Sequence, residues 1–89
     1  MPLVHFTAHL RSVVAKSPVV AEGADVRSAL RGVFETHPQL EGYVLDERGV
    51  LRQHVCIFVD GEKLPNDRVL DAPLTRTSEV YVMQALSGG

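Results

Sequence analysis

The chain has 89 residues and a formal net charge of −2, from nine Lys and Arg against eleven Asp and Glu. No basic cluster is present to neutralise phosphates, so the sequence gives no electrostatic basis for nucleic-acid binding. Its apolar stretches are far shorter than the roughly 20 residues needed to cross a bilayer, and its first residues lack the pattern of an export signal. The single cysteine, Cys56, precludes an internal disulfide and fits a reducing compartment. We therefore expect one domain over residues 1–89, in the cytoplasm and without membrane contact.

Alternation of apolar and polar residues predicts a strand over residues 3–10. One side of this strand would carry Val4, Phe6, Ala8 and Leu10, and the other side His5, Thr7 and His9. Residues 19–22 are expected to return as the second strand of a hairpin.

An amphipathic helix is predicted next. Asp25 offers a side-chain oxygen that can cap its first turn. Apolar residues then recur at i, i+4, i+7 and i+8, the spacing of one helix face, and they are Val26, Leu30, Val33 and Phe34. The pair His37-Pro38 should end the helix, because the residue before a proline is disfavoured in the helical conformation.

The second half of the chain predicts three further features. Residues 43–53, with the turn-like Asp46-Glu47-Arg48-Gly49 at their centre, are expected to form a hairpin arm or an extended loop. Residues 55–59 are apolar on both faces and predict a central strand, and Asp60-Gly61 directly after them predicts a tight turn. Residues 79–85 alternate and predict a closing strand. The arrangement that buries all these stripes is an α+β fold, in which one main helix crosses a mixed sheet of four or five strands.

The end of the sequence is its sharpest functional feature. Leu86, Ser87, Gly88 and Gly89 directly follow the predicted closing strand and are expected to form a flexible, extended tail. Four residues beyond Ala85 reach at most about 14 Å, and two glycines without a Cβ can pass through a narrow channel. Such a tail could bring the carboxylate of Gly89 to a phosphate or a thiol, and activation, for instance as an acyl-adenylate, would make that carboxylate an electrophile. The alternative is a frayed terminus without function.

No other residues predict catalysis or metal binding. The neighbours of Cys56 contain no base or cation to lower its pKa, so a packing role is expected. His5 and His9 are four residues apart, which on a strand separates them by about 13 Å, too far to share one metal ion. With His37 and His54, they are interpreted as surface or packing residues.

The outward side of the predicted sheet is a candidate docking surface. If Val80 and Val82 face the helix, Tyr81 and Met83 face away from it, and Phe58 and Cys56 can join them from the neighbouring strand. An aromatic and methionine patch on an open sheet face is typical of protein docking. The alternative is that the arm over residues 43–53 folds across this face and covers it.

Taken together, the order of elements, the segment Phe58-Val59-Asp60-Gly61 and the end Met83-Gln84-Ala85-Leu86-Ser87-Gly88-Gly89 resemble the MoaD/ThiS family of ubiquitin-like sulfur carriers. The resemblance covers most of the chain and implies a β-grasp fold. Residues 51–60, with the longer arm before them, are similar to the branch of the family that serves cysteine biosynthesis. Molybdopterin, thiamine or a specialised metabolite are the other destinations of sulfur in the family.

The resemblance also implies roles for the tail. Gly89 would be the site of the acyl-adenylate and the thiocarboxylate, with Gly88 as its partner. A ubiquitin-activating-like adenylating enzyme would supply the ATP site, and a downstream synthase would accept the sulfur. The chain itself would be a protein co-substrate without a cofactor.

Two other functions are compatible with the same sequence. A ubiquitin-like modifier attached to lysines through Gly89 would have the same fold and tail. A plain interaction module, in which Gly-Gly is incidental, would keep its function after loss of the last two residues.

Overall fold

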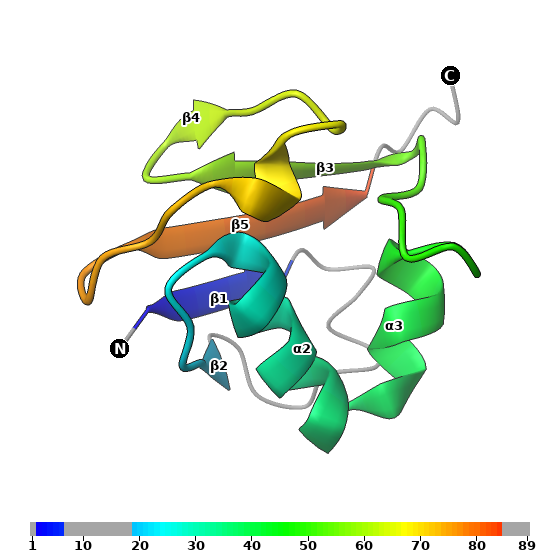
Figure 1. Ribbon diagram of the computed structural model, residues 1–89, viewed down its shortest axis with the longest axis horizontal. Coiled ribbons are helices and arrows are strands. Elements are labelled where there is room, and N and C mark those ends of the chain that lie inside the picture. The colour runs from blue at the N-terminus through cyan, green and yellow to red at the C-terminus, as the bar shows by residue number, and fades with distance from the viewer. Residues whose placement is uncertain (1, 7–18, 85–89) are drawn as a thin grey trace.

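The computed structural model describes residues 2–6 and 19–84, the last of them by its backbone only. These residues form a five-stranded sheet and two α-helices (Figure 1). The strands are β1 (Leu3–Phe6), β2 (Val19–Val20), β3 (Val55–Val59), β4 (Glu62–Lys63) and β5 (Glu79–Gln84). The helices are α2 (Val26–Thr36) and α3 (Pro38–Val44), and a short 3₁₀ helix, η1, covers Val69–Asp71. This confirms the α+β class and the mixed sheet.

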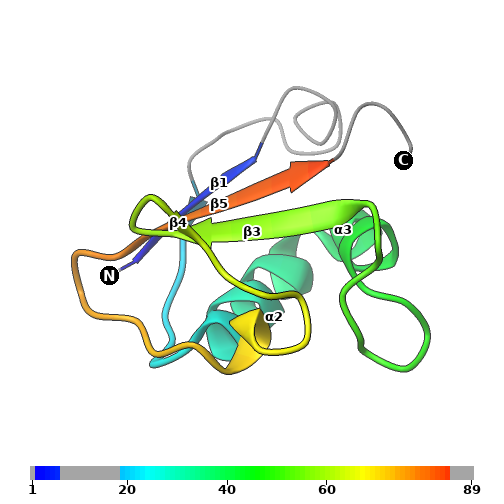
Figure 2. The same cartoon turned by 90° about the horizontal axis from the view of Figure 1, so that it is seen from above.

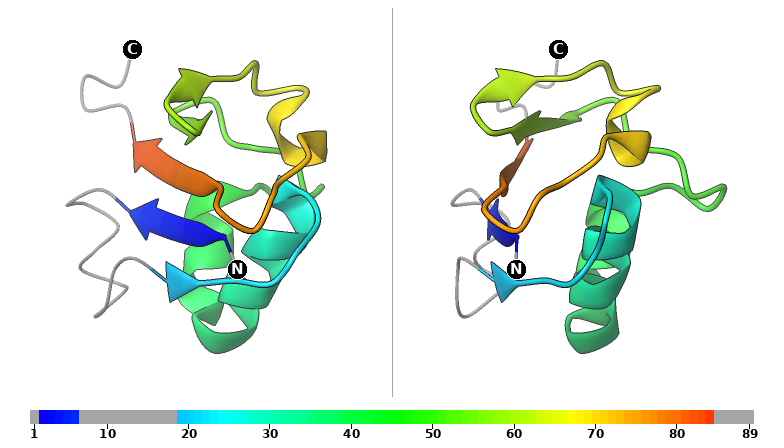
Figure 3. Two further views of the ribbon diagram at one scale, coloured as in Figure 1. Left: turned by 90° about the vertical axis from the view of Figure 1, so that its left-hand side faces the viewer. Right: turned by 60° about the vertical axis from the view of Figure 1, so that its left-hand side comes forward.

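The sheet has the strand order β2-β1-β5-β3-β4. β1 and β5 run parallel, and the other neighbouring pairs are antiparallel. Figure 3 shows β1 between β2 and β5, as the hydrogen-bonding order requires. The first and last strands of the chain therefore lie side by side in the middle of the sheet.

One face of the sheet and the apolar stripe of α2 form the core. The inward residues of the three long strands are Val4 and Phe6, Val55 and Ile57, and Val80 and Val82, and all are buried. They belong to one cluster with the predicted helix stripe of Val26, Leu30, Val33 and Phe34. The inward face of the strands and the apolar face of α2 thus pack together, as their periodicities predict.

The boundaries of α2 follow the predicted signals. The Asp25 carboxylate accepts a hydrogen bond of 2.8 Å from the Ser28 amide, which satisfies one of the free N–H groups of the first turn. At the other end the His37 amide donates to the Val33 carbonyl, and Pro38 begins a separate helix.

The prediction of a hairpin arm or extended loop over residues 43–53 is partly wrong. The first of these residues belong to α3, which begins at Pro38 because a proline is tolerated in the first helical turn, where its missing N–H has no partner to lose. Leu40 and Val44, four residues apart, are buried against the core and explain why this segment is helical. Leu45 and Leu51 then pair in an isolated antiparallel bridge around the predicted turn.

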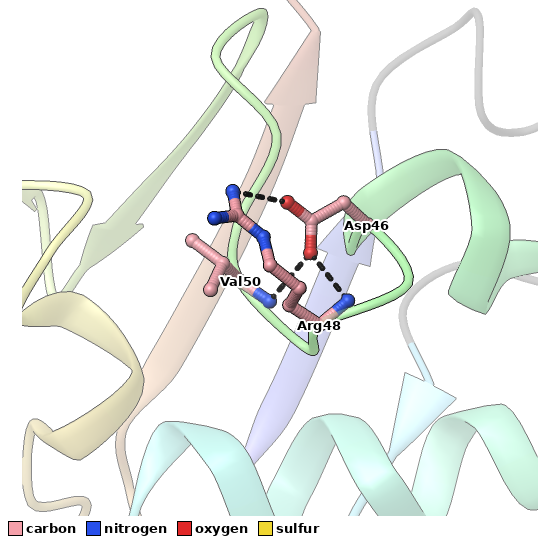
Figure 4. A network of polar contacts seen from close by, with 3 residues as sticks. All are labelled: Asp46, Arg48 and Val50. Carbon is pink, nitrogen blue, oxygen red and sulfur yellow. Dashed lines mark hydrogen bonds and ion pairs between the residues drawn. The ribbon is translucent and has the colours of Figure 1, made fainter.

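That turn is held by the side chain of Asp46 (Figure 4). Its carboxylate accepts hydrogen bonds from the amides of Arg48 and Val50, at 2.8 and 3.1 Å, and contacts the Arg48 guanidinium at 3.1 Å. The amides of Val50 and Arg48 hold the pKa of this carboxyl below its ordinary value. Gly49 takes the positive φ of 78° that closes the turn.

The prediction of a central strand over residues 55–59 is confirmed in that β3 lies between two other strands and not at an edge. β5 lies at the centre, β3 lies beside it, and β4 pairs only with the last two residues of β3. The outward residues Cys56 and Phe58 are half-buried rather than enclosed, so the apolar run does not mark a strand covered on both faces. The tight turn is confirmed, because Asp60 and Gly61 both have positive φ, 51° and 86°, as a two-residue hairpin requires.

The described residues contain no helix that is both long enough and apolar enough to span a membrane.

Candidate functional site

The sheet has an outward face, on the side away from both helices. In Figure 2, α2 and α3 lie on the same side of the sheet. Half-buried side chains occupy the outward positions of the three long strands, and they are Leu3, His5, Cys56, Phe58, Tyr81 and Met83. The structure thus brings together Phe58, Tyr81 and Met83, the residues predicted to form a docking patch.

Four of the outward positions form one row across the sheet. In register, His5 of β1 lies beside Tyr81 of β5, Tyr81 beside Phe58 of β3, and Phe58 beside Lys63 of β4. The His5 and Tyr81 rings are stacked, with centroids 4.2 Å apart and an interplanar angle of 6°. Neighbouring side chains on one face of a sheet stabilise each other, and aromatic pairs do so most. The centre of the face is therefore a row of flat rings that ends in a cation.

The next row contains Cys56 and Met83, which face each other across β3 and β5. Cys56 is half-buried and flanked in its strand by apolar residues, in agreement with the predicted packing role. Two sulfur-containing side chains add a polarizable, adaptable surface next to the aromatic row.

The arm around residues 45–53 does not cover this face. Leu51 is buried in the core, and the Arg52 amide donates to the Val44 carbonyl, so the arm is tied to α3. Figure 2 shows this segment on the helix side of the sheet. The alternative in which the arm covers the aromatic patch is wrong.

Polar groups at the start of β5 anchor one end of the face. The His5 Nε2 lies 2.9 Å from the Glu79 Oε1, with side-chain exposures of 21% and 48%. The Glu79 amide donates to the Asp60 carboxylate at 2.9 Å, and the Asp60 amide donates to the Glu79 carbonyl at 2.8 Å. The buried Ser78 hydroxyl donates to the same carboxylate at 3.2 Å. The hairpin turn after β3 is thereby fastened to the beginning of β5.

Sequence reasoning missed the part that His5 plays. The sequence indicates an ordinary surface or packing residue at His5, whereas its ring stacks on Tyr81 and contacts the Glu79 carboxylate. The pairing depends on the parallel alignment of β1 with β5, which leaves no local pattern in either segment. The only available signal was that His5 lies at an outward position of its strand.

The predicted tail lies outside the described residues. β5 ends at Gln84, and Leu86, Ser87, Gly88 and Gly89 follow it in the sequence. Five residues beyond Gln84 reach at most about 17 Å. Gln84, the last described residue, belongs to the central strand and lies in register with Val55, next to the Cys56–Met83 pair.

Over residues 2–6 and 19–84, no three His, Cys, Asp or Glu side chains gather closely enough to hold a metal ion. His9 lies outside this range.

A mixed five-stranded sheet crossed by α2, with its first and last strands parallel at the centre, defines a ubiquitin-like β-grasp protein. The chain belongs to the ThiS family, whose model matches residues 4–89. It therefore has the ubiquitin-like sulfur-carrier fold, and the small carriers of that family are not enzymes themselves. No curated protein sequence matches the chain.

Solved structures agree with this assignment. The chain is similar to SAMP1 from Haloferax volcanii, with a TM-score of 0.79 and 25% identity over 99% of this chain and 98% of that one. It also matches a chain of the Amycolatopsis orientalis BexX/CysO complex, with a TM-score of 0.88 and 21% identity over the full length of both. Mycobacterium tuberculosis CysO gives a TM-score of 0.85 and 18% identity over 97% of this chain and all of that one. The last two likenesses establish the fold alone.

Proposed function

We propose that the chain is a sulfur carrier protein whose working group is the C-terminal carboxylate of Gly89. The observation that carries the proposal is the match of the ThiS family model over residues 4–89, which includes the Gly-Gly end. The fold supports it, because a tail that starts from the central strand of a rigid sheet can be presented to an enzyme without rearrangement of the core.

The chemistry takes place in two steps, both on a partner enzyme. A carboxylate oxygen of Gly89 attacks the α-phosphorus of ATP, which forms an acyl-adenylate and releases pyrophosphate. Hydrosulfide, supplied by a donor at the sulfide oxidation level, then attacks the activated carbonyl carbon and displaces AMP, and loss of the S–H proton leaves a thiocarboxylate. A downstream synthase takes this sulfur. Leu86, Ser87 and Gly88 serve to place Gly89, and the absence of a Cβ at residue 88 admits the tail to a narrow channel.

Phe58, Tyr81 and Met83 supply the docking surface for the adenylating enzyme. An enzyme that binds the tail also contacts the end of β5. The outward residues of β5 and β3 lie next to that end of the strand, within reach of the same enzyme. Aromatic and methionine side chains are the types enriched at protein interfaces. The protein acts in the cytoplasm, where ATP is available and Cys56 stays reduced.

A second candidate function is that of a protein modifier. It is favoured by the 25% identity with SAMP1 from Haloferax volcanii, because SAMP1 from Methanosarcina acetivorans is described as a small archaeal modifier protein. In this role the activated Gly89 would form an isopeptide bond with a lysine of a target protein. The fold and the tail serve both roles equally.

The intact mass of the protein isolated from its native cell separates the two functions. The carrier is expected in part as a form heavier by the difference between a sulfur and an oxygen atom, with the change on Gly89 in the fragment spectrum. The modifier is expected as a Gly89 remnant on lysines of other proteins after digestion. A free chain that never acquires sulfur and never forms adducts, in cells that express its partners, would contradict both.

A further inference from the structure

The position of Tyr81 makes its ring the centre of the outward face. It lies on the central strand, with Phe58 beside it on β3 and His5 beside it on β1. The His5 ring is stacked on it almost in parallel, at 4.2 Å and 6°. One side of the Tyr81 ring is thus already covered by this chain's own imidazole, which leaves less freedom for the ring to turn.

The His5 ring is itself held in place. Its Nε2 lies 2.9 Å from the Glu79 carboxylate, and the backbone of Glu79 is bound in both directions to Asp60, at 2.8 and 2.9 Å. A half-buried polar ring would otherwise be free to turn towards water. The contacts run from the hairpin turn at Asp60 through Glu79 to His5 and end on Tyr81.

We infer that His5 is a positioning residue for the docking of the adenylating enzyme, a role that rests on the proposed function. The imidazole holds the Tyr81 ring in the orientation that an apolar strip of the enzyme contacts while the tail enters the active site. Ordering a free side chain on binding costs roughly two- to tenfold in affinity, and a ring ordered beforehand avoids this loss. His5 does not touch ATP or the Gly89 carboxylate.

The test is the ATP–pyrophosphate exchange catalysed by the adenylating enzyme of the same organism, with the full chain as the varied substrate. His5→Ala is expected to raise KM for the chain about three- to tenfold with kcat unchanged, because the tail chemistry is untouched. His5→Phe keeps a flat ring that can stack on Tyr81. An apolar ring avoids water and needs no contact with Glu79 to stay there, so the KM of this variant is expected to lie close to the wild-type value. Glu79→Ala is expected to raise KM less than His5→Ala does. His54→Ala, a histidine outside the row, should change neither constant.

Several results would overturn the inference. An unchanged KM for His5→Ala is one, and an equal rise for His5→Ala and His5→Phe is another, since the stacked ring would then not be the cause. Loss of kcat instead of a rise in KM would place His5 in the chemistry. If His5→Ala fails to fold, an unchanged KM for folded Glu79→Ala decides against the inference. Failure of the proposed function is distinguishable, because the wild-type chain would then support no exchange.

Discussion

At the scale of the residue, Gly23 lies so close to the first turn of α2 that no side chain fits. A Cβ built on Gly23 would lie 2.6 Å from the Ala29 amide nitrogen and 2.9 Å from the Ser28 Cβ. The Ala29 nitrogen belongs to the helix backbone, so the contact cannot be relieved by rotation of a side chain. The loop before the helix depends on this close approach.

Gly23→Ala is therefore expected to destabilise the fold by about 1–3 kcal/mol, as overpacking does. Gly42→Ala is the matched control, because a Cβ at Gly42 meets nothing within 4 Å and an alanine within α3 should stabilise by up to about 1 kcal/mol. Chemical denaturation measures both. Equal free energies of unfolding for the two variants would contradict the close approach.

The cap of α2 predicts a pH dependence. The hydrogen bond from the Ser28 amide lowers the pKa of Asp25 in the folded state, so the folded pKa lies below the unfolded one. The stability that the carboxylate contributes is fully present above the unfolded pKa and is lost as the pH falls through the folded pKa.

Asp25→Ala should cost about 1 kcal/mol at neutral pH, through loss of the cap. Asp25→Asn keeps a capping oxygen without the titration, so its stability should fall less steeply than that of the wild type below about pH 4. Urea unfolding at neutral and acid pH checks both. If the free energy of unfolding falls equally with pH in Asp25→Asn and in the wild type, the Asp25 carboxylate does not contribute to the acid dependence of stability.

At the scale of the element, local signals predicted the segments that carry their own patterns. The cap and stripe of α2 and the Asp60-Gly61 turn are local and are confirmed. The alternation predicted over residues 3–10 and 79–85 is confirmed over residues 3–6 and 79–84, and the remaining residues of both segments lie outside the described ones. The helix α3 was missed because Pro38 indicates the end of one helix as strongly as the start of another. The reason for its helicity, burial of Leu40 and Val44 in the core cluster, exists only in the folded chain.

The contact between α2 and the sheet predicts a large effect at Phe34. Its side chain is 8% exposed and belongs to the core cluster, so Phe34→Ala should cost about 3–5 kcal/mol. Val50→Ala, at a position 46% exposed, should cost less than about 0.5 kcal/mol. Guanidinium denaturation measures both, and a loss below about 1 kcal/mol at Phe34 would count against the packing of α2 on the sheet.

At the scale of the whole molecule, the sheet separates two faces with different surroundings. The helices cover one face (Figure 2). The register of β1, β3 and β5 puts the aromatic row and the Cys56–Met83 pair on the other. The sequence predicted that Phe58, Tyr81 and Met83 share the outward face, because outward alternation is local. It did not predict His5 on Tyr81 or the central place of β5, because both depend on the parallel pairing of the two ends of the chain.

This separation predicts that docking can be lost without loss of the fold. Tyr81→Asp places a charge in the aromatic row and should weaken binding to the adenylating enzyme at least tenfold, as charges at an interface centre do. Tyr43→Asp is the matched control, since Tyr43 is 50% exposed on the helix side. Calorimetric binding measures the effect, and circular dichroism checks the fold. Equal affinities for the two folded variants would contradict docking on the outward face.

The central claim is that the carboxylate of Gly89 is the working group. The direct measurement is the intact mass of the chain after incubation with its adenylating enzyme, ATP and a sulfide source. The wild type should exchange one terminal oxygen for sulfur, while deletion of Gly89 should abolish the exchange because the new carboxylate falls about 3.5 Å short of its target. Gly88→Ala should be folded, with its stability changed by less than about 0.5 kcal/mol, and poorly converted. A deletion variant that acquires sulfur at its new terminus at the wild-type rate would contradict the claim.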